Sequence, residues 1–392
     1  MCYAIPGKVT EINDNIITVD YFGEKKKARN DFYALSSGDY IYAQGGFVIK
    51  VVPQKEALGV LDAWREVFFE LQGLDLRLAD GPRNLFQRAN AVRQKCLGNS
   101  CCIHGIIEFS NHCTSDCLYC GIRKSNAKVA RYRMDIDEIA QCVRYAVSEL
   151  NFKALVLQSG EDHWYTEEKL VGLIKKIMRE FPVLLILSVG ERGKEFYRKL
   201  YEAGARGVLL RFETANPSLY EKYRPGHKLK DRIELIKELK RIGYLVFTGF
   251  LVGLPQETDE DLLNSIELTG SLSPEMFSFG PFIPHPDTPL KDAPRPTAEL
   301  ALSAIARARI RYPESRILAT TSLETLDQEN GAKLGLLSGA NSLMINVTPQ
   351  RYQRLYEIYP QRAGIDLRVT ERIDSTLKLL RSLGRAPTDL GI

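Results

Sequence analysis

From residue 106 onward, short apolar runs alternate with longer amphipathic segments, and this alternation constrains the fold more than any other feature. Each apolar run has the length of a buried strand, and the segments between the runs space their apolar residues as a helix does. Eight strands separated by helices can close into a (β/α)8 barrel. The sequence therefore predicts an α/β fold of the TIM type. The expected strands are 106–109, 154–158, 183–189, 207–212, 244–252, 276–279, 316–319 and 341–345, and the helices include 135–150, 167–181, 194–203, 230–242, 259–270 and 297–311.

The first 53 residues have a different texture, with short β-rich runs separated by Gly, Asn, Asp and Ser turns. The runs at 8–12, 16–21, 25–30, 40–43 and 47–52 predict a small all-β barrel domain that precedes the large barrel. Two helices, at 55–72 and 83–95, are expected to join the barrels, with a break at 73–82. The predicted organisation is 1–53 for the small barrel, 54–105 for the connecting helices, 106–349 for the large barrel and 350–392 for a closing helical segment.

Composition narrows the possible partners and the compartment. With 53 basic and 49 acidic side chains the net charge is only +4, which argues against a nucleic-acid partner. No apolar run approaches the ~20 residues of a membrane span, and the N-terminus lacks the pattern of a signal peptide. We therefore expect a cytoplasmic protein without a membrane partner, whose cysteines are thiols or metal ligands. Four of them, Cys96, Cys101, Cys102 and Cys142, are expected to be small buried residues.

Cys113, Cys117 and Cys120 follow the first expected strand with C-x3-C-x2-C spacing. Thiolates this close together in one loop suit iron-sulfur clusters or zinc. Zinc usually takes four protein ligands, and His112 or a distant residue would have to supply the fourth. Three ligands instead suit a 4Fe-4S cluster with one open iron that could bind S-adenosylmethionine. Reductive cleavage of that sulfonium would yield a 5'-deoxyadenosyl radical. The aromatic Tyr119 just before the last cysteine resembles the pattern of radical S-adenosylmethionine enzymes, which implies a place for Tyr119 beside the adenine.

Polar and glycine-rich segments follow the expected strands. In a (β/α)8 barrel the carboxyl ends of the strands form the active-site face, so these segments should converge. Each alone is weak, because such residues are common in turns, but together they predict one site. The segments are 159–162 (SGED), 188–191 (SVGE), 211–217 (RFETANP), 249–257 (GFLVGLPQE), 280–289 (GPFIPHPDTP), 320–321 (TT) and 346–348 (NVT).

The opening run MCYAIPGKV, with GDY at 38–40 and GFVI at 46–49, resembles the HypC/HupF family of hydrogenase assembly chaperones. The resemblance implies that Cys2, exposed after removal of the initiator methionine, helps to hold an iron-cyanide-carbonyl unit together with a histidine. This chain has Gln44 where that histidine is expected, so a docking or vestigial barrel is the alternative. We expect the small barrel to dock a maturation partner near the mouth of the active site.

Residues 83–392 resemble the HydE family of FeFe-hydrogenase maturases, which are radical S-adenosylmethionine enzymes. The resemblance rests on IIEFSNxC with CLYCGIR, on LQSGED, on LLRFETANP and on GPFIPHPDTPL. It implies that Cys113, Cys117 and Cys120 ligate the cluster, that Ser159 and Gly160 lie near the methionine amine with Glu161 beside them, that Ser188, Glu213 and Arg232 contact S-adenosylmethionine, and that Arg211, Thr320, Thr321 and Tyr352 line the inner substrate cavity.

The family reaction implied by the resemblance acts on a mononuclear iron complex bearing cysteine, carbon monoxide and cyanide, and it prepares the hydrogenase di-iron subcluster. Hydrogenase maturation proteins are the implied partners. Some relatives carry a second cluster near the C-terminus, but no cysteine follows Cys142, so one cluster is expected. The alternatives are a biotin-synthase-like or methylornithine-synthase-like enzyme acting on a small organic substrate, a HydE-like maturase of the iron-only hydrogenase, and a non-enzymatic iron carrier or scaffold.

Overall fold

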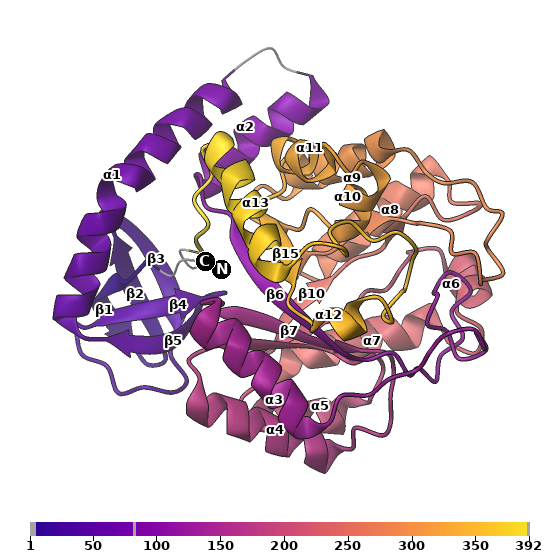
Figure 1. The fold of residues 1–392 in the computed structure, drawn as a ribbon. Helices are drawn as coiled ribbons and strands as arrows, with labels where there is room; N and C mark the ends of the chain where they lie inside the picture. The colour runs from indigo at the N-terminus through magenta and orange to yellow at the C-terminus, as the bar shows by residue number, and fades with distance from the viewer. Residues whose placement is uncertain (1–4, 81–83, 390–392) are drawn as a thin grey trace.

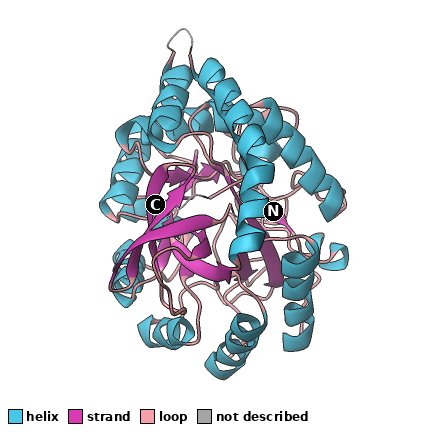
Figure 2. Ribbon diagram, turned by 90° about the vertical axis from the view of Figure 1, so that its left-hand side faces the viewer, coloured by secondary structure: helices cyan, strands magenta, loops and turns pink. Residues whose placement is uncertain are grey.

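Eight parallel strands form the centre of the molecule, in a computed structural model that describes residues 5–80 and 84–389. They are ordered β14-β12-β10-β9-β8-β7-β6-β15, and a single parallel bridge from Leu318 to Ser342 closes the sheet into a barrel. Helices surround these strands on the outside (Figures 1 and 2). The predicted TIM-type fold is confirmed. The strands are β6 Cys102–Ser110, β7 Ala154–Ser159, β8 Leu184–Ser188, β9 Gly207–Leu209, β10 Leu245–Thr248, β12 Met276–Phe277, β14 Arg316–Ile317 and β15 Ser342–Asn346.

The helices cover the barrel with their apolar faces, and several begin at side-chain caps that the sequence supplies. Thr166, Thr258 and Thr297 each accept a backbone N–H of the first helical turn, which satisfies one of its otherwise unpaired donors. The helices of the large barrel are α3 Ile136–Arg144, extended by the π-helix η1 Tyr145–Glu149, α4 Glu167–Glu180, α5 Lys194–Glu202, α6 Pro217–Tyr223, α7 Leu229–Ile242, α8 Asp259–Ser271, α9 Ala298–Arg311, α10 Thr321–Leu326, α11 Gly331–Leu337, α12 Gln350–Gln353 and α13 Val369–Ser382.

Several of the predicted strands have different limits in the structure, and the first and fifth differ most. β6 begins at Cys102, four residues before the predicted start, and all of its residues are buried. The expected strand 244–252 is divided into β10 and β11, Leu251–Val252, which pairs with β13, Gly280–Pro281. Gly249 lies at the division with φ +158°, and a Cβ there would lie 2.3 Å from the Ser278 carbonyl oxygen. This close backbone approach separates the short outer pair from the main sheet.

The small barrel is also confirmed, as five strands closed in the order β1-β2-β3-β5-β4. Its core contains Val9, Ile17, Val19, Ile41 and Val48, each of which is fully buried. In β2, from which Ile17 and Val19 come, buried and more exposed positions alternate, the pattern of a strand with one buried face. β4 instead is buried throughout, because its other face packs on the large barrel. The strands are β1 Gly7–Asn13, β2 Ile16–Tyr21, β3 Glu24–Arg29, β4 Tyr40–Gln44 and β5 Phe47–Val52.

The small barrel covers the amino-terminal end of the large barrel, beside which it lies in Figure 1. Tyr42, Phe47 and other apolar residues of β4 and β5 form one cluster with inward-facing residues of the large-barrel strands. The turn between β4 and β5 packs so closely there that a Cβ on Gly45 would lie 2.8 Å from a methyl carbon of Leu184. The expectation that this domain lies near the mouth of the active site is therefore wrong, because the carboxyl ends of the strands point the other way.

Polar contacts reinforce this junction. The Gln44 side-chain amide donates to an Asp389 carboxylate oxygen at 2.9 Å and approaches the Cys102 sulfur at 3.2 Å. The backbone N–H of Gly45 donates to the same Asp389 oxygen, and Arg316 forms an ion pair with the other at 2.6 Å. The residue that replaces the family histidine is thus buried at the interface between the barrels. The expected iron-binding residue Cys2 lies outside the described residues.

The connecting helices are α1, Gln54–Ala79, and α2, Leu85–Leu97. The predicted helix break is wrong over its first seven residues, because α1 continues through Gly73. One glycine inside a helix costs only about 1 kcal/mol. That cost is offset where Asp75 of α1 pairs with Arg93 of α2 at 2.6 Å and with Arg385 at 3.0 Å, all three being buried.

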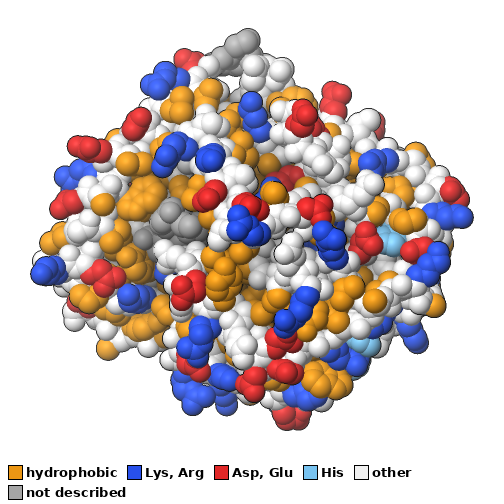
Figure 3. Space-filling view, in the orientation of Figure 1, with side chains coloured by type: hydrophobic (Ala, Val, Ile, Leu, Met, Phe, Trp, Pro, Cys, Tyr) orange, Lys and Arg blue, Asp and Glu red, His pale blue; other side chains and the backbone are white. Residues whose placement is uncertain are grey.

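The remaining cysteines and the surface match the sequence in most respects. Cys101, Cys102 and Cys142 are buried, as expected, but Cys96 is exposed on α2, so the prediction for Cys96 is wrong. Acidic and basic side chains are interspersed over the face seen in Figure 3. Among the described residues, no helix combines the length and apolar character required to cross a bilayer.

Candidate active site

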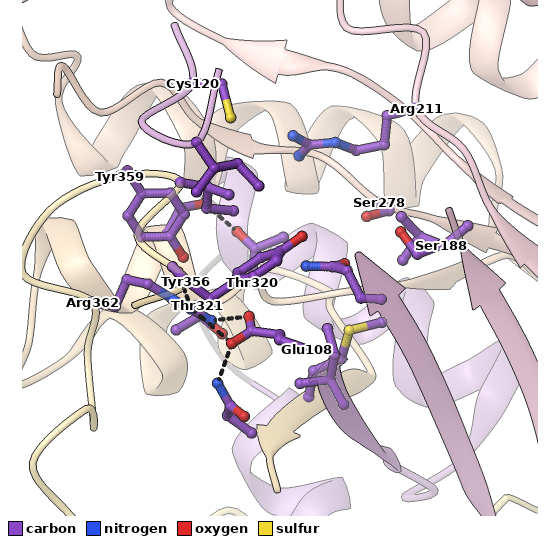
Figure 4. A pocket seen from close by; sticks show the side chains of 18 of the residues that line it. Glu108, Cys120, Ser188, Arg211, Ser278, Thr320, Thr321, Tyr356, Tyr359 and Arg362 are labelled. Atoms are coloured by element: carbon purple, nitrogen blue, oxygen red, sulfur yellow. Dashed lines mark hydrogen bonds and ion pairs between the residues drawn. The ribbon is translucent and has the colours of Figure 1, made fainter. Parts of the chain in front are cut away.

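A cavity of about 330 Å³ lies at the carboxyl ends of the large-barrel strands. The three cysteines of the triplet line it, together with most of the rim residues selected from the sequence. Figure 4 shows Cys120 at one end of the cavity and the Glu108–Arg362 pair at the other, with Arg211 directed into the space between them. The predicted residues among its lining are Cys113, Cys117, Tyr119, Cys120, Ser159, Gly160, Glu161, Ser188, Arg211, Glu213, Arg232, Thr320 and Thr321.

Burial raises the pKa of the three thiols. For Cys113 the pKa rises to about 11, even though backbone N–H groups of Glu161 and Ser115 favour its thiolate. Burial and the neighbouring cysteine thiolates also raise the pKa of Cys120, and burial is the main cause for Cys117. Converging thiolates without a cation are therefore unfavourable. A soft metal centre would supply the compensating positive charge, so this donor set fits a cluster.

Gly160 forms a cradle against the cysteine loop. A Cβ at this position would lie 2.2 Å from the carbonyl oxygen of His112 and 2.9 Å from the Cβ of Cys113. The Gly160 N–H donates to the Ser110 carbonyl at 3.0 Å, which fixes its distance from the end of β6. Only a residue without a side chain allows the end of β7 to lie this close to the loop.

Glu161 joins the cysteine loop to the neighbouring rim segments. Its carboxylate accepts from the Ser115 hydroxyl at 2.6 Å and from the Glu191 N–H at 3.2 Å, and Arg224 lies 3.5 Å away. Arg224 is buried and lies 3.6 Å from the Glu191 carboxylate.

Arg232 is held at the same rim through its Nε, which contacts Glu191 at 2.8 Å and the Tyr220 hydroxyl at 3.2 Å. Among the described residues its terminal nitrogens form no hydrogen bond, so they can receive a carboxylate.

Glu213 is held in an unusual conformation for a residue with a side chain. Its φ is +68°, in the left-handed region, and its N–H donates to the Gly249 carbonyl at 3.2 Å. Arg211 Nη2 lies 3.2 Å from Glu213 Oε2, yet the angle does not make a hydrogen bond, and this buried oxygen has no donor among the described residues. Such strain and an unpaired acceptor are typical of ligand sites. The hydroxyl or amine of a bound cofactor would satisfy this oxygen.

The inner end of the cavity is built around a buried ion pair. Arg362 donates to both Glu108 oxygens, at 2.6 and 3.1 Å, and the Asn346 amide donates to Glu108 at 2.8 Å. A carboxylate within the buried strand β6 was a signal available in the sequence, because such groups need a partner. The sequence analysis did not select these residues, nor Tyr356, Tyr359 and Arg224, which also line the cavity.

Tyr352 is the predicted site residue that the structure does not bring to this cavity. Its hydroxyl donates to the Glu138 carboxylate at 2.9 Å, and its ring stacks on Tyr132 at 4.6 Å. It therefore belongs to the contact between α12 and α3, on the outside of the barrel. The nearby Tyr356 is the tyrosine of this segment that reaches the cavity.

Glu257, on the rim segment after β11, gives the stability of the fold a pH dependence. Burial raises its pKa from 4.5 to about 7, although the Gly253 N–H donates to it. The folded state then binds more protons than the unfolded state between these pH values, so the free energy of unfolding falls as pH rises through this window. One pKa unit corresponds to about 1.4 kcal/mol, so we expect a loss of roughly 2–3 kcal/mol.

The test compares urea unfolding of the unaltered chain and of Glu257→Gln at pH 5 and pH 8. Groups that titrate in both chains cancel in the difference. The variant should gain stability relative to the unaltered chain as pH rises, by roughly 2–3 kcal/mol over this interval. A difference that does not change with pH would contradict the expectation.

Comparison with known proteins identifies the class. Residues 107–269 match the Radical SAM superfamily, and residues 1–64 match the HupF/HypC family. The fold is thus that of a radical S-adenosylmethionine enzyme. The [FeFe] hydrogenase maturase subunit HydE of Thermotoga maritima is 41% identical over 303 residues, which cover 77% of this chain and 86% of that protein. At this level of identity and coverage, the chain belongs to the HydE family.

Other relatives are more distant. 3-methylornithine synthase of Methanosarcina barkeri is 27% identical, over 80% of this chain and 88% of that protein. A crystal structure of methylornithine synthase superposes with a TM-score of 0.68 at 25% identity, covering 82% of this chain and 94% of that one. The structure of HydG, a maturase of the [FeFe]-hydrogenase, has a TM-score of 0.64 at 19% identity over 81% of this chain and 74% of that one, a likeness of fold alone.

Proposed function

We propose that this chain is a radical S-adenosylmethionine enzyme that matures the active site of [FeFe] hydrogenase. The family relationship with HydE carries this proposal, and the three cysteines that line one cavity together with the predicted rim residues support it. Cys113, Cys117 and Cys120 hold one 4Fe-4S cluster with an open iron. When bound, the reduced cluster and S-adenosylmethionine supply a 5'-deoxyadenosyl radical.

The cavity residues divide into two groups in this proposal. Ser159, Gly160, Glu161, Ser188, Glu213 and Arg232 bind S-adenosylmethionine, with Tyr119 beside the adenine. The terminal nitrogens of Arg232 grip its carboxylate, and Glu213 Oε2 accepts from a hydroxyl or amine. Arg211, Thr320 and Thr321 orient the substrate, a mononuclear iron complex bearing cysteine, carbon monoxide and cyanide. The closed barrel excludes water from the radical.

The test is anaerobic. The cluster is reconstituted and reduced with dithionite, S-adenosylmethionine is added, and 5'-deoxyadenosine is quantified, with Cys117→Ala as the control. The unaltered chain should form the product and the control should not. A fully loaded chain that forms none would refute the enzyme and favour an iron carrier. Hydrogenase maturation proteins are the proposed partners. An assay of the chain in a mixture that contains them then tests whether the iron complex is its substrate.

A second candidate function is radical chemistry on a small organic molecule. The likeness to methylornithine synthase, at 25% identity and a TM-score of 0.68, is the observation that favours it. The two candidates share the cleavage of S-adenosylmethionine and differ in the molecule attacked. The products formed from each molecule distinguish the candidates. Conversion of the iron complex would favour the maturase. Conversion of an amino acid, with no reaction of the iron complex, would favour the alternative.

A further inference from the structure

Arg131 joins the two ends of the cysteine loop. One terminal nitrogen of its guanidinium donates to the carbonyl of Asn111, two residues before the first cysteine. The same nitrogen donates at 2.8 Å to the carbonyl of Ile122, two residues after the last cysteine. The other donates to the carbonyls of Arg123 at 2.6 Å and Asn126 at 3.3 Å. A planar fork with several fixed donors can hold four carbonyls, which a lysine cannot do.

In the part of the chain that the structure describes, the charge of Arg131 has no carboxylate partner. Other cations near the loop have acidic partners: Arg123 pairs with Asp116 at 2.6 Å, and Arg133 with Asp162 at 2.7 Å. Among the described residues, no carboxylate forms an ion pair with Arg131. Burial lowers its pKa, and the thiolates of Cys113 and Cys120 are the charges that oppose this shift. The carbonyls that Arg131 binds flank the cysteine loop, so its charge lies close enough to interact electrostatically with two of the three proposed cluster ligands.

We propose that Arg131 is a positioning residue for the cluster: it holds the ends of the cysteine loop together and supplies a positive charge that raises the cluster's reduction potential. This inference rests on the proposed cluster at Cys113, Cys117 and Cys120. Reduction adds one negative charge at the cluster, and a fixed cation beside it stabilises the reduced form. Net charge and hydrogen bonding around the sulfurs are established determinants of cluster potential.

Three substitutions separate the two roles. Arg131→Gln and Arg131→Met remove the charge, and Arg131→Lys keeps the charge but cannot hold four carbonyls. Arg192→Gln is a matched control, because Arg192 also donates to two backbone carbonyls, those of Asp162 and Tyr165, neither of which belongs to the cysteine loop. Each full-length chain is reconstituted anaerobically. Iron and sulfide per chain are measured, followed by the midpoint potential in a redox titration monitored by electron paramagnetic resonance without S-adenosylmethionine.

We expect the two neutral variants to have a more negative midpoint potential than the unaltered chain. At the midpoint potential of the unaltered chain, their ratio of reduced to oxidised cluster should be roughly tenfold lower, which corresponds to a shift of about 59 mV. Arg131→Lys should keep the potential but load less iron, and Arg192→Gln should change neither. If both neutral variants fail to load whereas Arg131→Lys loads, the charge is required and the proposal is supported.

The proposal would be overturned if all three Arg131 variants loaded fully and had the potential of the unaltered chain. It would also be overturned if all three failed to load, because the charge would then have no role apart from holding the loop. Failure of the proposed function gives a different result. An unaltered chain that binds no iron-sulfur cluster would refute the cofactor itself. A chain that binds the cluster but cleaves no S-adenosylmethionine still allows the titration.

Discussion

A Gly160→Ala chain is expected to fold but to lose most of its bound iron and roughly 100-fold of its 5'-deoxyadenosine production, the size of loss that an ~1 Å misplacement causes. The new Cβ would lie 2.2 Å from the His112 carbonyl oxygen and 2.9 Å from the Cβ of Cys113. The first contact is with backbone, which cannot rotate aside. The loop must therefore move, and the first cysteine moves with it.

The measurements are iron and sulfide per chain after reconstitution, 5'-deoxyadenosine formed, and thermal unfolding of the apoprotein. Gly172→Ala is the matched control, because Gly172 lies in α4 and, apart from the neighbouring residues and backbone of its own helix, no atom lies within 4 Å of the added Cβ. That control should retain its iron and gain about 0.5–1 kcal/mol, as expected for alanine in a helix. Full iron content and activity in Gly160→Ala would mean that the loop tolerates the shift.

Continuous apolar runs predicted most of the fold, because the barrel strands are buried on both faces. β7, for example, begins with the apolar run Ala154 to Leu157, which is fully buried, and the sequence range matched it within one residue. The end of α1 could not be predicted in the same way. It depends on Asp75 meeting Arg93 and Arg385, and no local pattern predicts a contact with Arg385, which lies hundreds of residues further along the chain. The placement of the small barrel against the base of the large one was missed for the same reason.

The candidate site shows a similar division. The cysteine triplet and the segment containing Ser159 and Gly160 follow strands, so the barrel geometry alone brings them to one rim. Tyr356 and Arg362 come from an irregular segment after β15, which has no periodicity from which an orientation could be read. The assignment of Tyr352 to the cavity failed there, because neighbouring tyrosines in such a segment face different partners. The roles of the cavity residues and the domain limits stay predictions.

Asp75→Asn is expected to lower the free energy of unfolding by about 3–5 kcal/mol, the cost of leaving a buried charge without its partner. Asp75 contacts two arginines, Arg93 at 2.6 Å and Arg385 at 3.0 Å, and the side chains of both are 0% exposed. Burial and the repulsion of Arg93 lower the pKa of Arg385 to about 9, and Asp75 opposes this shift. Without the carboxylate, two guanidinium groups would repel each other in a region from which water is excluded.

Urea unfolding at pH 7 measures this effect, and Asp62→Asn, an exposed site on the same helix, is the control that should change stability by less than about 0.5 kcal/mol. Adding Arg385→Met to Asp75→Asn removes one of the two stranded cations. The double variant should therefore be more stable than Asp75→Asn alone, because the coupling between contacting groups is not additive. Equal losses in Asp75→Asn and Asp62→Asn would show that this junction of α1, α2 and the C-terminal segment does not depend on the charge of Asp75.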